Sequence, residues 1–184
     1  MNNYFETAYA LSNLKRFPSH HVNKPQNVAT HTANCMFIAM YIIEADKVEC
    51  DRSILLQKIL FHDFVEGKTG DIAAPIKHHS KELYSKIKDL ESEMLTFIFK
   101  DLPVNFKQIA VEAKEGKEGE IVSLVDIIER LIYLCMEKRS GNQVTNDVYI
   151  DTNNKLKTKT FRELLKKYPT AGEIIFHYLS KVQL

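Results

Sequence analysis

Apolar side chains recur at intervals of three and four residues along most of this chain, and this period constrains its fold more than any other feature. Residues at these intervals lie on one face of an α-helix, so each such segment predicts an amphipathic helix with one buried side. The pattern is clearest in three segments: Tyr4, Ala8 and Leu11; Cys35, Ile38, Tyr41 and Ile42; and Leu83, Ile87, Leu90, Met94 and Phe97. Alternating segments that predict β-strands are almost absent.

The periodic segments together predict an all-α chain. We expect helices at roughly 3–14, 28–45, 52–66, 80–100, 104–114, 120–138, 158–167 and 171–182. Prolines and glycines stand in or next to the connections between these helices, at Pro18, Pro25, Gly67, Gly70, Pro75, Pro103 and Pro169. The charged segment 114–120 is a short loop and not a linker, so the sequence predicts a single helical domain.

Length and composition exclude several classes of protein. With 184 residues, of which 45% are hydrophobic and 27% charged, the chain can bury a core and form one globular domain. Its formal net charge is +1, without the basic excess of a protein that binds nucleic acid polymers or membranes. No apolar run approaches the roughly 18 residues of a membrane-spanning helix.

The cysteines indicate a reducing compartment. Cys35, Cys50 and Cys135 are few, odd in number and far apart in the sequence. This spacing argues against a disulfide framework and against a cysteine-based zinc site. We therefore expect a cytoplasmic protein.

One apolar run ends in a group of ionisable residues. The segment ILFHDFVEGKTGD, residues 59–71, contains His62, Asp63, Glu66 and Asp71. If the helix continues to 66, His62 and Glu66 share a face with Asp63 beside them, and an imidazole next to carboxylates can hold a metal ion. The alternative is that the helix surfaces here and its polar residues meet water. GKT is not the end of a P-loop, because that motif requires a glycine where His62 stands and a preceding strand.

A catalytic metal site needs further ligands from other segments, and two residues are candidates. His31 lies in the first turns of an otherwise apolar helix, where the alternative is a hydrogen-bonded core histidine. Asp126 interrupts the apolar run EIVSLVDIIERLIYLC, and a buried carboxylate needs a partner. Its alternative is exposure to solvent beside Arg130, on a polar helix stripe.

The order of a histidine, a His-Asp pair and a distant aspartate resembles the HD-domain metal-dependent phosphohydrolases. The surrounding segments are similar to those of the bacterial HD-domain 5′-deoxynucleotidases: RFP at 16–18, QNVATH at 26–31, HDFVEGKTGDIAAPIK at 62–77 and VDIIERLIYLCMEKRSGN at 125–142. The resemblance covers about residues 4–142, and the C-terminal helices match only in kind. It implies a single HD-type helical bundle over residues 1–184, with the core motifs in 16–142.

The resemblance also implies roles for individual residues. The ligands of one divalent ion are His31, His62, Asp63 and Asp126. Glu66 matches the acidic residue beside the metal, and Asp71 matches an acid that contacts the substrate, so both are candidate catalytic residues. Arg16 matches the arginine that meets the phosphate, and Lys77 is a further candidate for substrate binding. Phe17 stands where these nucleotidases typically carry tryptophan against the sugar, which leaves the strictness of deoxyribose selection open.

These residue types suit phosphoester hydrolysis for general reasons. The phosphate oxygens repel an anionic nucleophile, so a cation must neutralise them and acidify a water molecule. Two imidazoles and two carboxylates suit manganese, cobalt, iron, zinc or magnesium better than calcium. Glu66 can then accept or donate a proton, and the Arg16 guanidinium offers a forked donor to phosphate.

The sequence therefore predicts a hydrolase that removes the 5′-phosphate from deoxyribo- or ribonucleoside monophosphates, and the resemblance implies a homodimer. One alternative is release of triphosphate from deoxynucleoside triphosphates, which extra basic residues near the pocket, such as Lys68 and Lys77, would favour. The other is a non-catalytic regulatory module with a vestigial site. Base preference and the physiological metal stay open.

Overall fold

The computed structural model describes residues 2–77 and 79–182, and these ranges form eleven helices and no β-strand apart from one isolated bridge. The helices are α1 (Asn2–Asn13), α2 (Val28–Ala45), α3 (Arg52–Phe61), α4 (Glu66–Thr69), α5 (Ala74–Lys77), α6 (Lys81–Ile98), α7 (Val104–Val111), α8 (Gly116–Arg139), α9 (Asn146–Leu156), α10 (Lys159–Lys167) and α11 (Pro169–Ser180). The prediction of an all-α fold is confirmed. None of these described helices has the length and apolar content needed to cross a bilayer.

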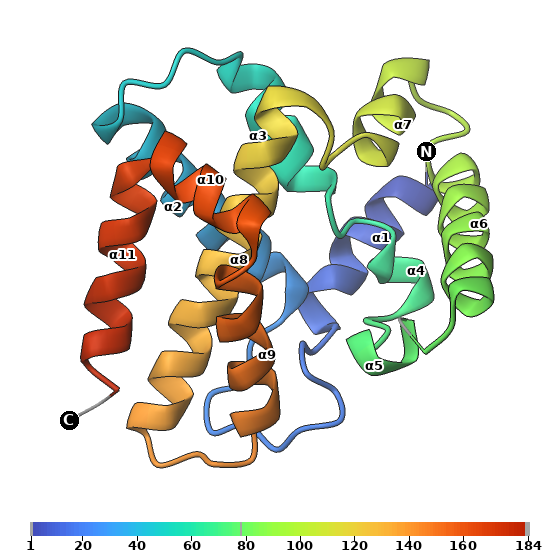
Figure 1. Cartoon of the computed structure of the whole chain (residues 1–184). Helices are drawn as coiled ribbons and strands as arrows, with labels where there is room; N and C mark the ends of the chain where they lie inside the picture. Colours follow the sequence, from blue (N-terminus) through green and yellow to red (C-terminus); the bar gives the residue numbers. More distant parts are fainter. Residues whose placement is uncertain (1, 78, 183–184) are drawn as a thin grey trace.

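Helix α8 is the centre of the main core. It packs against α2, α3, α9 and α11, which surround it in Figure 1. Its fully buried side chains include Leu124, Ile128 and Leu131, and burial of each such side chain stabilises the fold by about 1.5–3 kcal/mol. The same helix buries Asp126 and Glu129, at 6% and 2% exposure, and buried carboxylates require charged or hydrogen-bonding partners.

A second, aromatic cluster lies where α3 ends, against α1, α6 and α7 (Figure 1). Phe61 and Phe64 are both buried in it, and each of their rings lies within 6 Å of the Phe99 ring, with centroid distances of 5.3 and 5.6 Å. These two phenylalanines bracket His62 and Asp63 in the sequence. Their burial on one side of the chain therefore holds the turn that carries the His-Asp pair.

The predicted helix at 52–66 is wrong in its C-terminal part. Helix α3 ends at Phe61, residues 62–65 form turns, and Glu66 begins the short helix α4. In the turns the N–H of Phe64 donates to the carbonyl of Phe61, three residues back, and the N–H of Glu66 donates to that of Asp63. His62 and Glu66 consequently do not share a continuous helix face.

Other parts of the helix assignment also differ from the prediction. The short α5 and the whole of α9 were not predicted, and α8 begins at Gly116, four residues before the expected start at 120. The sequence of α9 shows little apolar periodicity, because only Thr152 and Leu156 are buried and the rest of the helix need not be apolar. This is why the helix was not predicted. The glycines at the start of α8 have low helix propensity, so the sequence does not predict its first turn as helix.

Candidate metal centre

The structure brings four of the predicted site residues together: His31, from the first turn of α2; His62 and Asp63, from the turn after α3; and Asp126, from the middle of α8. The His31 Nε2 lies 3.3 Å from the His62 Nε2, 3.6 Å from the Asp63 Oδ2 and 3.5 Å from the Asp126 Oδ1. The His62 Nε2 and Asp63 Oδ2 are 3.2 Å apart. Donors bonded to one ion at about 2.0–2.2 Å have comparable mutual distances, so this donor set fits a divalent metal.

The ring of His31 is oriented by Glu129, a residue that the sequence analysis missed. The His31 Nδ1 lies 2.5 Å from the Glu129 Oε2, which turns the Nε2 toward the other donors. The Glu129 Oε1 accepts hydrogen bonds from the side-chain amides of Gln26 (2.5 Å) and Asn34 (3.1 Å). Burial acts to raise the pKa of Glu129, but the His31 hydrogen bond and charge, with Arg16, hold it below its usual range. A carboxylate behind a histidine is the usual outer support of a metal site.

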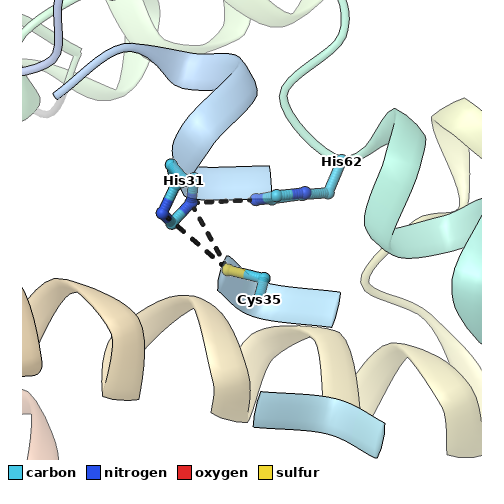
Figure 2. Close-up of side chains that lie close together, drawn as sticks. All are labelled: His31, Cys35 and His62. Atoms are coloured by element: carbon cyan, nitrogen blue, oxygen red, sulfur yellow. Dashed lines mark hydrogen bonds between the residues drawn. The ribbon is translucent and has the colours of Figure 1, made fainter. Parts of the chain in front are cut away.

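His62 is oriented in the same way by a backbone group. Its Nδ1 lies 2.6 Å from the carbonyl oxygen of Ile59, so this nitrogen donates to the backbone. The Nε2 is left to face His31, as Figure 2 shows. Both imidazoles thus present the nitrogen that a metal needs, and the second nitrogen of each is held by an oxygen acceptor.

Asp126 is buried and is not the solvent-exposed partner of Arg130 that the alternative prediction described. Its Oδ2 accepts a hydrogen bond of 2.6 Å from the Lys114 Nζ, and Arg130 lies 3.7 Å from the other oxygen. Burial acts to raise its pKa, but Lys114 first, and then His31 and Arg130, hold it well below the usual range. Asp126 is therefore an ionised carboxylate inside the core.

Cys35 is the competing donor, since its sulfur lies close to both histidines (Figure 2). The Sγ is 3.8 Å from the Nδ1 and 3.7 Å from the Nε2 of His31. Near-equal distances to both nitrogens place the sulfur against the ring and not in line with either lone pair. Burial also raises the pKa of this thiol strongly, and a neutral thiol is a poor ligand. The two carboxylates complete the donor set better.

Two further acids lie beside these donors. Glu66 begins α4, and Asp71 lies in the loop that follows it. Burial, and then the charges of Asp63 and Asp71, raise the pKa of Glu66 to about 10. Burial likewise raises the pKa of Asp71, which accepts a hydrogen bond from the backbone N–H of Phe17. Glu66 is therefore an acid beside the candidate metal site whose surroundings favour its protonated form.

The loop between α1 and α2 supplies a buried cation. The backbone N–H of Arg16 donates to the backbone carbonyl of Gln26 at 2.9 Å, and this bond closes the loop. The residue as a whole is only 8% exposed. Its Nη1 lies 3.6 Å from the Glu129 Oε2, outside hydrogen-bond distance, and has no hydrogen-bond partner within the described part of the chain. A buried guanidinium nitrogen without a partner fits an anionic ligand.

The same loop holds an aromatic pair. Phe17 has a positive φ of 56°, which is uncommon for a bulky residue and often marks a functional loop. Its ring stacks on Tyr133 of α8 at a centroid distance of 5.3 Å and an interplanar angle of 4°. Tyr133 is fixed in turn, because its hydroxyl donates to the Lys24 carbonyl.

The two candidate basic residues, Lys77 and Lys68, are both engaged by carboxylates. The Lys77 Nζ donates to Glu91 at 2.6 Å, and the Lys68 Nζ lies 3.5 Å from Glu6. Glu129, Tyr133 and Lys114 were not predicted. A signal for Glu129 existed, because it follows Asp126 by three residues in an apolar run and so lies on the same face of α8.

The chain is similar in sequence to known nucleotidases. A sequence model of the family described as 5'-deoxynucleotidase YfbR-like matches residues 3–167. The chain is 27% identical over 157 residues to a 5'-deoxynucleotidase of Photorhabdus temperata, covering 79% of each, and 26% identical over 176 residues to one of Yersinia pestis, covering 89% of this chain and 86% of the relative.

Solved structures show the same similarity. An HD-domain phosphohydrolase from Listeria innocua superposes with a TM-score of 0.81 at 25% identity, over 99% of this chain and 92% of that one. The cyanophage S-2L HD phosphohydrolase bound to dA and one catalytic Zn²⁺ ion superposes with a TM-score of 0.67 at 19% identity, over 97% and 95% of the two chains. At that lower identity the likeness concerns the fold.

The support of His31 by Glu129 leads to a prediction. Glu129→Gln keeps the shape of the side chain but removes the charge that holds the imidazole, so we expect the Kd for Mn²⁺ to rise by about 10–100-fold. Isothermal titration of metal-depleted protein measures this. Glu93→Gln, an exposed site on α6, is the matched control and should bind like the wild type. Equal affinities in all three proteins would show that Glu129 does not support the site.

Proposed function

The chain belongs to the YfbR-like 5'-deoxynucleotidase family, has the HD-domain fold and is a metal-dependent phosphohydrolase of nucleotides; from this premise we propose that it removes the 5′-phosphate of deoxyribonucleoside monophosphates. The observation that carries the proposal is the convergence of two imidazole nitrogens and two carboxylate oxygens within 3.2–3.6 Å of their neighbours.

We propose that one divalent ion is held by His31, His62, Asp63 and Asp126. The identity of the ion is open among manganese, cobalt, iron, zinc and magnesium, because imidazole and carboxylate ligands together do not select one of them. When bound, such an ion supplies Lewis-acid and water-activating chemistry to phosphoester hydrolysis.

Three side chains near the proposed ion would bind the substrate or transfer a proton. We propose that Arg16 binds the phosphate, since its buried Nη1 lacks a hydrogen-bond partner among the described residues and a guanidinium matches phosphate geometry. Glu66 holds or releases a proton at the reacting phosphate, since burial and the charges of Asp63 and Asp71 raise its pKa and favour the protonated carboxyl. Asp71 contacts the substrate from the position where it already accepts the Phe17 N–H.

The sugar is proposed to lie against the aromatic pair of Phe17 and Tyr133. The Arg16 guanidinium is 5.5 Å from the centre of the Phe17 ring, so a phosphate on Arg16 would bring the sugar close to this ring. Lys77 is proposed as a more distant substrate contact, reached by exchange of its Glu91 partner. Lys68 and Lys77 are each paired with a carboxylate, so neither is an unpaired cation for additional phosphates. This weighs against the triphosphate alternative.

We further propose that residues 1–184 act as one HD domain, as a homodimer in the cytoplasm. The family relationship supports the dimer. The three cysteines, free in the structure, support a reducing compartment. The complete donor set weighs against a vestigial, non-catalytic site.

A substrate panel tests the proposed function. Metal-depleted protein is assayed for release of inorganic phosphate and triphosphate from ribo- and deoxynucleoside mono- and triphosphates, with each candidate ion added in turn. We expect phosphate release from deoxyribonucleoside monophosphates, dependent on added metal and abolished in His62→Ala. Triphosphate release as the main activity, or activity equal in His62→Ala, would overturn the proposal.

Glu66 is predicted to act in proton transfer and not in holding the ion. Glu66→Gln retains the shape and loses the titrating group, so we expect turnover to fall about 100-fold or more while metal affinity persists. The two quantities are measured on the same preparation, by phosphate release and by titration with the ion. Simultaneous loss of metal and activity would instead make Glu66 a ligand.

Phe17 is predicted to influence sugar selection. Tryptophan is larger than phenylalanine, so Phe17→Trp should leave less room for a 2′-hydroxyl and raise the ratio of kcat/KM for deoxy over ribo monophosphates by about tenfold. Phe176→Trp, at a ring 75% exposed on α11, is the control and should leave the ratio unchanged. The assignment of the ring to the sugar fails if the ratio is the same in all three proteins.

A further inference from the structure

Lys114 has a contact at the candidate metal centre that the proposed function does not use. It lies in the loop between α7 and α8, and its Nζ donates to the Asp126 Oδ2 at 2.6 Å. The other oxygen of Asp126, Oδ1, faces the His31 Nε2 at 3.5 Å. The two oxygens of this carboxylate therefore have different partners, one in the loop and one in the donor cluster.

The backbone of Lys114 is held in place by two independent features. Gly119 of α8 packs directly against it, and a Cβ at Gly119 would lie 2.3 Å from the Lys114 carbonyl carbon and 2.8 Å from its oxygen. Only glycine permits this approach. In addition, Lys58 of α3, itself 8% exposed, donates through its Nζ to the carbonyl of Glu115 at 2.6 Å. The loop is thus held at Lys114 and at Glu115, directly before α8.

The contact between Lys114 and Asp126 is the closest one that the carboxylate makes with a cation. Arg130, on the same helix as Asp126, lies 3.7 Å away, outside hydrogen-bond distance. The Lys114 side chain is 46% exposed, whereas that of Asp126 is 8% exposed, so the lysine reaches the buried acid from the protein surface. Because Asp126 is buried, this cation also stabilises the ionised carboxylate, so the metal affinity of folded variants, and not their stability, has to test a role at the site.

We propose that Lys114 is a positioning residue of the metal centre, which holds the Oδ2 of Asp126 so that the Oδ1 is presented to the ion. The inference rests on the proposed function, because it requires that Asp126 is a ligand. It assigns a task to the first residue of the charged segment KEGKEGE, for which the sequence predicted only a short loop. Lys114, Gly119 and Lys58 together act as one support for a single ligand.

The sign of the effect on metal affinity separates this role from a simple charge effect. A lysine that acted only through its charge would repel the ion, so its removal would strengthen binding. Loss of an outer hydrogen bond that orients a ligand weakens binding, by about 10–100-fold. The affinity of the protein for Mn²⁺ alone, without substrate, therefore distinguishes the two.

The experiment is isothermal titration of metal-depleted full-length protein with MnCl₂, after circular dichroism has shown that each variant is folded. We expect Lys114→Met to raise the Kd by about 10–100-fold and Lys114→Arg to restore most of the affinity, since a guanidinium still donates to the carboxylate. Lys117→Met, an exposed lysine three residues away, is the matched control and should bind like the wild type.

Gly119→Ala provides a second, independent variant. Its Cβ must displace the Lys114 backbone, so it should weaken Mn²⁺ binding, and the double variant with Lys114→Met should bind no more weakly than Lys114→Met alone. If Lys114→Met binds Mn²⁺ as tightly as the wild type, or more tightly, the inference is overturned while the proposed function stands. If the wild type itself binds no divalent ion, the proposed function fails.

Discussion

The burial of two carboxylates within α8 is the constraint on which the site depends. Asp126 and Glu129 lie one turn apart on a helix whose neighbouring side chains form the hydrophobic core. An isolated charge in such surroundings costs many kcal/mol, so it persists only with cations and hydrogen-bond donors in contact. Arg16, His31 and Lys114, from three other segments, meet this requirement. The partners that stabilise the fold are thereby gathered into one place.

The two hydrophobic clusters turn this requirement into a defined geometry. The main core fixes α2 against α8, which sets His31 beside both acids. The aromatic cluster buries Phe61 and Phe64, and so holds the turn that contributes His62 and Asp63. Side chains that come from rigid, separately packed elements have a defined spacing. The backbone contacts of His62 and the carboxylate behind His31 add orientation to that spacing.

The loop between α1 and α2 is tied to the C-terminal end of α8 and to the residues that follow it. Glu137 of α8 accepts the backbone N–H groups of Asn23 and Lys24, and Asn142 donates to the His21 carbonyl. These bonds explain the segment EKRSGN as a clamp for the loop and not as part of the chemistry. The clamp fixes the loop that carries Arg16, whose Nη1 lies 3.6 Å from the Glu129 Oε2 behind the donor cluster.

The amino-acid sequence by itself determined the helical class, because periods of three and four residues are local and directly readable. It also supplied the residues His31, His62, Asp63 and Asp126, whose types and order indicate metal chemistry. Only the tertiary structure decided where α3 ends, that α9 forms, and which partners hold the ligands. Glu129 supports His31 from 98 residues away, and Lys114 reaches Asp126 through packing at Gly119. Such contacts depend on how whole helices pack, which no local pattern of residues contains.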